Sequence, residues 1–136
     1  MYHKVGQYTG PLQSLVAIIP YPSDASGMGY RTVHGVESLY APYLQETFPG
    51  RWARGFLSII WKDGSIAPHL DSDMRADAAR FHLVIQTNPD CWMLHDSQWQ
   101  QLEAGGIYTL DPLIPHASVN WGHSTRVHLV VDVLHE

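Results

Sequence analysis

The sequence contains a single cysteine, Cys91, among 136 residues. One cysteine excludes an intrachain disulfide framework, a zinc site built from several thiolates and an iron–sulfur cluster held by this chain alone. Long apolar runs are missing as well: about 18 consecutive apolar residues occur nowhere, and the start MYHKVGQYTGPLQ has no apolar segment of the signal-peptide type. These absences predict a soluble, cytoplasmic protein with no membrane as a partner.

Positive charge is also scarce. Eight Lys and Arg residues stand against 13 Asp and Glu residues, which gives a net charge of −5 at pH 7, and no block of like charge occurs. Such a surface lacks the basic footprint that binds a phosphate backbone, so we expect no nucleic acid as the direct ligand. The length, with 45% hydrophobic and 15% charged residues and no repeat or linker, predicts a single domain over residues 1–136.

The apolar runs are short, β-branched or aromatic, and bounded by Gly, Pro, Asp and Asn, a pattern typical of an all-β domain. The expected strands are 15–20, 55–61, 66–69, 80–86, 91–94, 106–110, 116–120 and 125–134. Residues 36–48 have helical apolar spacing with Pro42 inside, 97–104 could form a short helix, and 21–30 have the composition of a long loop. One or two short helices are therefore expected, at the N-terminal side of the strands.

Two of the expected strands alternate between polar and apolar residues. Their polar positions are Arg80, His82 and Gln86 in one strand, and Arg126, His128 and Asp132 in the other. A sandwich whose polar faces meet water would give the same period, but solvent faces usually carry Lys, Glu and Thr rather than Arg and His. The residue types therefore favour a barrel with a polar, ligand-holding interior.

Histidine is abundant, with nine residues in the chain. His69 and Asp71 are two residues apart on chain expected to be extended, so their side chains point to the same side and could share a metal ion. His116, which follows 45 residues after Asp71, is the candidate third ligand. Two imidazoles and one carboxylate on one face of an octahedral ion form the facial triad of non-heme Fe(II) oxygenases.

Arg126 follows ten residues after His116, on a strand expected to lie beside it. A buried guanidinium can bind a carboxylate through two parallel hydrogen bonds, and an oxygenase of this kind needs such a group for the distal carboxylate of 2-oxoglutarate. The alternative is that Arg126 pairs with Asp132 or with another acidic residue.

From Gly55 to the C-terminus, the chain resembles the aspartyl/asparaginyl β-hydroxylase family of Fe(II)/2-oxoglutarate-dependent oxygenases. The matching stretches, in order along the chain, are Ser58-Ile59, Ala67-Pro68-His69, the strand 80–85, Gly106 with Asp111, the segment 115–120, and the strand 126–133. The resemblance implies a double-stranded β-helix, a jelly-roll and cupin-like fold. It also implies that His69 and His116 bind iron and that Arg126 binds the distal carboxylate of 2-oxoglutarate.

By the same resemblance, Ser58, Arg80 and His82 would bind oxygens of the cosubstrate or set their orientation. The best-known animal member has glycine in place of the carboxylate ligand, whereas this chain has Asp71 there. Residues 1–54 carry no matching motif. We regard the loops 21–30 and 71–79 as candidates for the rim of the substrate site.

The expected activity is hydroxylation of an amino-acid side chain, in a peptide or as a free amino acid, with consumption of dioxygen and formation of succinate and CO2. Two alternatives remain: a non-catalytic jelly-roll binding module, and a cupin-type metalloenzyme that does not use 2-oxoglutarate. Release of succinate that depends on 2-oxoglutarate would separate the expected oxygenase from the cupin-type enzyme. The remaining polar residues favour simpler interpretations: His95, His123 and His128 as surface or strand-face histidines, and Asp73 and Asp77 as solvated side chains.

Overall fold

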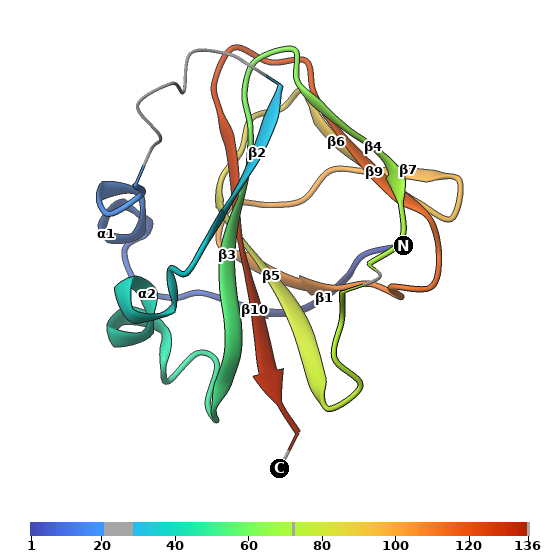
Figure 1. Ribbon diagram of the computed structural model, residues 1–136. Helices are drawn as coiled ribbons and strands as arrows, with labels where there is room; N and C mark the ends of the chain where they lie inside the picture. The colour runs from blue at the N-terminus through green and yellow to red at the C-terminus, as the bar shows by residue number, and fades with distance from the viewer. Residues whose placement is uncertain (21–28, 72, 136) are drawn as a thin grey trace.

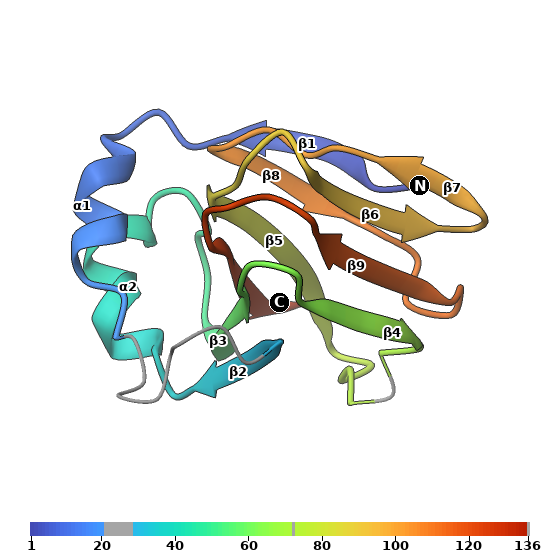
Figure 2. The same cartoon turned by 90° about the horizontal axis from the view of Figure 1, so that it is seen from above.

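The computed structural model describes residues 1–20, 29–71 and 73–135, which form two antiparallel sheets that face each other (Figures 1 and 2). The large sheet has the strand order β1-β8-β5-β10-β3-β2, and the small sheet the order β4-β9-β6-β7. The elements are β1 (His3–Gln7), α1 (Leu12–Ala17), β2 (Tyr30–His34), α2 (Glu37–Leu44), β3 (Trp52–Ile60), β4 (Ser65–His69), β5 (Ala78–Gln86), β6 (Cys91–His95), β7 (Gln98–Gln100), β8 (Gly106–Thr109), β9 (His116–Asn120) and β10 (Arg126–Leu134).

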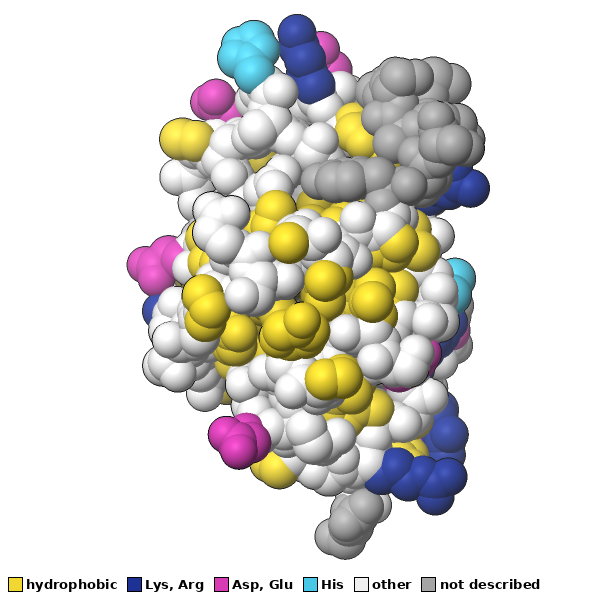
Figure 3. All heavy atoms as spheres, turned by 90° about the vertical axis from the view of Figure 1, so that its left-hand side faces the viewer, with side chains coloured by type: hydrophobic (Ala, Val, Ile, Leu, Met, Phe, Trp, Pro, Cys, Tyr) yellow, Lys and Arg dark blue, Asp and Glu magenta, His cyan; other side chains and the backbone are white. Residues whose placement is uncertain are grey.

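The two short helices lie outside the barrel, beside the large sheet, as Figure 2 shows from above. Their buried residues, Leu15 of α1 with Tyr40 and Leu44 of α2, belong to one apolar cluster with the outward-facing side chains of β3, β5 and β10. Burial of apolar surface between helices and sheet is the main driving force for this packing. The helix side of the molecule also keeps exposed apolar atoms among its polar ones (Figure 3), Leu39 and Tyr43 of α2 among them.

The inner face of the large sheet carries polar side chains beside a second, smaller apolar cluster that includes Val84. Arg80, Arg126, His128 and Asp132 are all buried, and their apolar strand neighbours point to the opposite face, into the helix-covered cluster. The alternation in the sequence therefore reflects a barrel with a polar interior, and the solvent-facing sandwich is excluded. The expected all-β jelly roll with short N-terminal helices is confirmed.

Two expected elements were wrong. Residues 15–20 were expected to form a strand, but Leu12–Ala17 is the helix α1, whose Leu12, Leu15 and Val16 follow the i, i+3, i+4 spacing of one helix face. Residues 97–104 were expected to form a helix. Instead Gln98–Gln100 is β7, paired with β6 through a tight turn in which Asp96 and Ser97 have φ of 53° and 63°.

Besides β7, two more strands lie outside the expected set. β1 pairs with β8 and β2 pairs with β3, so they form the two edges of the large sheet. Both are short and mostly exposed, which leaves little alternating pattern to detect. Of the expected loop 21–30, residues 21–28 lie outside the described residues, and Tyr30 begins β2. Neither helix of the described residues has the length and apolar character that a membrane span requires.

Candidate metal centre and cosubstrate pocket

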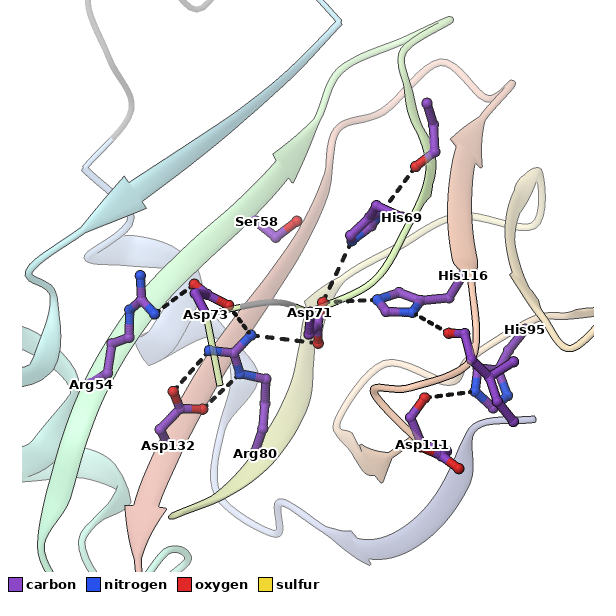
Figure 4. A network of polar contacts seen from close by, with 12 residues as sticks. Arg54, Ser58, His69, Asp71, Asp73, Arg80, His95, Asp111, His116 and Asp132 are labelled. Atoms are coloured by element: carbon purple, nitrogen blue, oxygen red, sulfur yellow. Dashed lines mark hydrogen bonds and ion pairs between the residues drawn. The ribbon is translucent and has the colours of Figure 1, made fainter. Parts of the chain in front are cut away.

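His69, Asp71 and His116 lie together at one end of the small sheet. One ligand atom from each of the three side chains can be chosen so that all lie within 4.8 Å of one another. His69 ends β4 and stands directly opposite His116, the first residue of β9. Figure 4 shows both imidazoles pointing toward the Asp71 carboxylate. A single ion could therefore reach all three side chains, since such ligand bonds are about 2 Å long.

A β-bulge produces this alignment. Ile66 is paired with Ser118, but the next pair is His69 with His116, so β4 uses three residues where β9 uses two. Without the extra residue, the alternation of side chains would turn His69 to the outer face of the sheet. The bulge contains Pro68, which an edge strand such as β4 tolerates because it needs no donor there.

Hydrogen bonds set the tautomers of both histidines. Nδ1 of His69 donates to the carbonyl oxygen of Ala67 at 2.9 Å, and Nδ1 of His116 donates to that of Ile114 at 3.0 Å. In the neutral rings Nε2 is then a lone-pair acceptor. These Nε2 atoms lie 3.6 and 3.0 Å from Oδ1 of Asp71, which is an acceptor too. Three acceptors that face one another fit a shared cation, either a proton or a metal ion.

The electrostatics of Asp71 and His116 agree with that geometry. Burial alone would raise the pKa of the Asp71 carboxyl, but the hydrogen bond with His116 and the charges of His116 and Arg80 lower it to about 2. Burial opposes protonation of His116, and the Asp71 carboxylate outweighs it and raises the pKa of the imidazole. Asp71 is thus a carboxylate at any pH at which the protein would work.

Arg80 lies next to Asp71 and is held by acidic side chains (Figure 4). Its Nε and Nη2 donate to the two carboxylate oxygens of Asp132 at 2.7 and 2.9 Å, across the β5–β10 pairing. Its Nη1 lies 3.5 Å from Asp71 and 3.3 Å from Asp73, and Asp73 also accepts from Arg54 at 2.6 Å. Arg80 therefore connects the candidate metal ligand to the ion pair between Arg54 and Asp73.

Arg126 has very different surroundings. It is 1% exposed, it donates from Nη2 to the Ser58 hydroxyl at 2.9 Å, and its Nε has no partner in the described part of the structure. Among the described residues no carboxylate forms an ion pair with it, because Asp132, the alternative partner, binds Arg80 instead. Burial lowers the pKa of Arg126 to about 10, so it remains a cation at neutral pH. A buried cation with unused donors is a site for an anion.

Further unpaired polar atoms surround Arg126. Both ring nitrogens of His82 and Nδ1 of His128 are buried without a hydrogen-bond partner in the described part of the chain. Burial lowers the pKa of His82 to about 3 and that of His128 well below its usual range, so both rings are neutral. Because buried polar groups are normally paired, this concentration of unpaired ones indicates a polar ligand.

One cavity of about 720 Å3 is lined by the candidate metal ligands, His82 and Arg126. All seven residues expected at the site line it: Ser58, His69, Asp71, Arg80, His82, His116 and Arg126. Tyr30 and Asp73, which belong to the two loops expected at the rim, also line it. The sequence interpretation assigned none of the other lining residues Tyr2, Thr32, His34, Arg54 and Phe56 to the site. Asp73 was expected to be solvated. It is half-exposed, and its ion pairs with Arg54 and Arg80 place it on the cavity wall.

The histidines that were not expected to bind metal differ in their burial. Of the two expected places, surface or strand face, His128 and His95 take a strand face, where they are 1% and 2% exposed, and His123 is exposed at the surface. His128 occupies the inner strand face that it shares with Arg126, the signal that pointed to it. His95 donates from Nε2 to the carbonyl oxygen of Asp111 at 3.1 Å, and its ring lies 6.3 Å from that of His116.

Comparison with known proteins agrees with this geometry. A family model described as aspartyl/asparaginyl beta-hydroxylase matches residues 38–136. The chain belongs to this family. The match confirms the resemblance in the sequence and begins earlier than Gly55, where the recognisable motifs start.

A curated relative is the L-proline cis-4-hydroxylase of Rhizobium meliloti (strain 1021), 29% identical over 74 residues. Those residues are 54% of this chain and 26% of that protein, so the chain spans about a quarter of the length of the relative.

Two solved structures share the fold. An oxidoreductase of the 2OG-Fe(II) oxygenase family from Burkholderia pseudomallei has a TM-score of 0.66 at 13% identity, over 96% of this chain and 82% of that one. The Cupin_2 domain of an XRE family transcriptional regulator from Enterobacter cloacae has a TM-score of 0.53 at 13% identity, over 80% of this chain and 100% of that one. At such identities these neighbours establish the cupin-like jelly roll and no activity.

Proposed function

We propose that this protein is an Fe(II)/2-oxoglutarate-dependent hydroxylase that acts on an amino-acid side chain, in a peptide or as a free amino acid. The observation that carries the proposal is that one cavity holds both the His69–Asp71–His116 cluster and the buried guanidinium of Arg126, which forms no ion pair with the described residues. The first suits a ferrous ion, and the second suits the distal carboxylate of 2-oxoglutarate.

The residues present fit both groups. The Nε2 lone pairs of His69 and His116 and the Asp71 carboxylate would hold the iron. When bound, iron and 2-oxoglutarate supply, with dioxygen, the oxidising power to hydroxylate a C–H bond, with formation of succinate and CO2. The chain's own contribution is to bind, orient and exclude water.

Arg126 and Ser58 would bind the distal carboxylate at the closed end of the cavity, where both side chains are already joined by a hydrogen bond. His82 is neutral, neither ring nitrogen has a partner among the described residues, and it therefore has a donor available for a cosubstrate oxygen. Arg80 differs from the expectation of a direct cosubstrate ligand, because two of its donors are taken by Asp132. We assign it the role of a positioning residue, which orients the Asp71 carboxylate from 3.5 Å away.

An amino-acid substrate suits the opposite end of the cavity. There Arg54 and Asp73, partly exposed and bound to each other, offer one cation and one anion at the opening. Phe56 lies under the Arg54 guanidinium, 5.3 Å from its carbon to the ring centroid, and beside His34 at 5.4 Å between ring centroids. A small molecule or residue with a charged group and an apolar part would find partners for both.

The test is anaerobic titration of the protein with Fe(II) and 2-oxoglutarate, observing the visible charge-transfer absorption expected of that chelate. His69→Ala and Asp71→Ala should both weaken Fe(II) binding. The second removes one ligand and one negative charge, and it should leave some residual binding through the two histidines. Equal Fe(II) affinity in wild type and Asp71→Ala would mean that Asp71 is not a ligand.

The same titration separates the alternatives. Metal binding without the absorption band, and without succinate when dioxygen and candidate amino acids are supplied, would indicate a cupin-type metalloenzyme that does not use 2-oxoglutarate. Absence of metal binding would indicate a non-catalytic module.

A further inference from the structure

Tyr2 is a buried residue of the cavity that lies outside the family match, which starts at residue 38. It precedes β1, the edge strand of the large sheet, and its side chain is 2% exposed. Its ring packs edge-on against His82, with 5.9 Å between ring centroids, and tilted against His95 at 5.8 Å. The phenol is thus wedged between one histidine from each sheet.

The backbone of Tyr2 is anchored on both sides by one side chain. The amide nitrogen of Tyr2 donates to Oε1 of Gln100, and Nε2 of Gln100 donates to the carbonyl oxygen of Tyr2, each at 3.0 Å. Gln100 belongs to β7, at the edge of the small sheet, so this pair of bonds joins the two sheets. The position of the ring therefore depends on backbone bonds and packing, and the hydroxyl is not needed to hold it.

That hydroxyl makes no hydrogen bond to the described residues, although the rest of the side chain is fully packed. The Tyr2 side chain lines the same cavity as those of Ser58 and Arg126. Burial raises the pKa of the phenol above its usual range, so it stays protonated and is a hydrogen-bond donor. A fixed donor that has no partner among the described residues, in the cavity that the buried Arg126 guanidinium also lines, is suited to an anion shared by both.

We propose that Tyr2 is a further residue of the cosubstrate site, whose hydroxyl donates a hydrogen bond to the distal carboxylate of 2-oxoglutarate beside Arg126 and Ser58. The inference rests on the proposed function, since it names the same cosubstrate. It means that the site extends across the barrel to the N-terminal segment: Arg126 and Ser58 come from central strands of the large sheet, and Tyr2 comes from its far edge.

The experiment compares Tyr2→Phe, which keeps the ring and removes only the hydroxyl, with wild type. The Mn(II)-loaded protein is titrated calorimetrically with 2-oxoglutarate and, separately, with 2-oxobutyrate, which keeps the 2-oxo acid end and lacks the distal carboxylate. A hydrogen bond to a charged group predicts a loss of about ten- to a hundredfold in the affinity for 2-oxoglutarate. The affinity for 2-oxobutyrate should stay unchanged.

Unchanged affinity for 2-oxoglutarate, or an equal loss for both acids, would overturn the assignment. Tyr43→Phe is the matched control, because it makes the same change on the exposed face of α2 and should bind both acids as wild type does. If wild type itself binds Mn(II) but not 2-oxoglutarate, the proposed function fails and the role of Tyr2 fails with it. If wild type binds 2-oxoglutarate and Tyr2→Phe binds it equally well, only the role of Tyr2 fails.

Discussion

Arg126 is a buried cation for which the described residues provide a hydroxyl and no carboxylate. Such a group costs stability until an anion arrives, because a buried charge without a partner loses its hydration. Replacement by an apolar side chain of similar length should relieve that cost and abolish the function. A substitution of Arg126 should therefore have opposite effects on the stability of the ligand-free protein and on the binding of 2-oxoglutarate.

We expect Arg126→Met to weaken 2-oxoglutarate binding by about 2 to 5 kcal/mol, the range for breaking a buried charge pair. The free energy of unfolding of the ligand-free protein should stay equal or rise. Calorimetric titration and urea unfolding measure the two quantities. A large fall in stability without ligand would show that Arg126 has a structural partner, and unchanged affinity would remove it from the cosubstrate site.

The buried neutral histidines predict that the folded protein loses stability in acid. The pKa of His82 in the folded protein is about 3 and that of His128 is well below its usual range, both because of burial. Below pH 6.5 the unfolded chain therefore binds protons that the folded protein does not. Stability should fall as the pH drops from about 6.5 toward 4, by up to about 1.4 kcal/mol per pH unit for each histidine. The raised pKa of His116 acts in a different window: its contribution to stability is lost as the pH rises above about 6.5, through the raised pKa, and is constant below.

His128→Leu isolates one of these contributions. Its free energy of unfolding, measured by urea titration of the metal-free protein at several pH values, should decline less steeply below pH 6.5 than that of wild type. His123→Gln, an exposed position, should follow the wild-type profile. Parallel profiles for wild type and His128→Leu would mean that His128 is protonated in the folded state.

The site residues that could be predicted from the sequence are those with a recognisable spacing along one segment of the chain. His69 and Asp71 stand two apart, and Arg126 and His128 share one strand face, so spacing alone places them together. Tyr2, Arg54 and Asp73 have no such pattern, because each reaches the cavity through a contact between distant segments. Asp73, for example, is held by side chains from β3 and β5, and only tertiary structure brings these near it.

At the scale of elements, the long central strands were easier to predict than the short elements and the edge strands. The central strands β3, β5 and β10 are long and alternate clearly, so their limits agree with the expectation to within a few residues. The segment 15–20 was misassigned because a short apolar run fits a strand and one turn of a buried helix equally well. Edge strands β1 and β2 bury little, so nothing in their composition distinguishes them from loops.

The bulge in β4 predicts that the length of this strand segment controls metal binding. Because the extra residue of β4 aligns His69 with His116, deletion of Ala67 should turn the His69 side chain away from the cavity and lower the affinity for Mn(II) at least tenfold. The deletion also removes the carbonyl oxygen that accepts from Nδ1 of His69. Ala67→Gly, which keeps the residue count and the carbonyl, should bind Mn(II) as wild type does. Equal affinity in the deletion variant, with thermal unfolding still cooperative, would contradict this role of the bulge.

At the scale of the whole molecule, the candidate site spans both sheets. His69 and His116 come from the small sheet, whereas Ser58, His82 and Arg126 come from the large one. A ligand that chelates a metal at one end and binds Arg126 at the other would link the two sheets. Metal and 2-oxoglutarate should therefore stabilise the barrel cooperatively, each raising the affinity for the other by the same factor.

Thermal unfolding with and without Mn(II) tests this linkage. A ligand present at one hundred times its dissociation constant adds about 2.7 kcal/mol of stability. Since Mn(II) should tighten binding of 2-oxoglutarate, the gain from a fixed concentration of 2-oxoglutarate should be larger with Mn(II) than without it. Glutarate is the matched control, because it has both carboxylates but lacks the 2-oxo group that completes the chelate, so its gain should depend far less on Mn(II). Equal dependence on Mn(II) for the two acids would mean that the cosubstrate does not reach the metal ligands, and that Arg126 and the His69–Asp71–His116 cluster serve separate ligands.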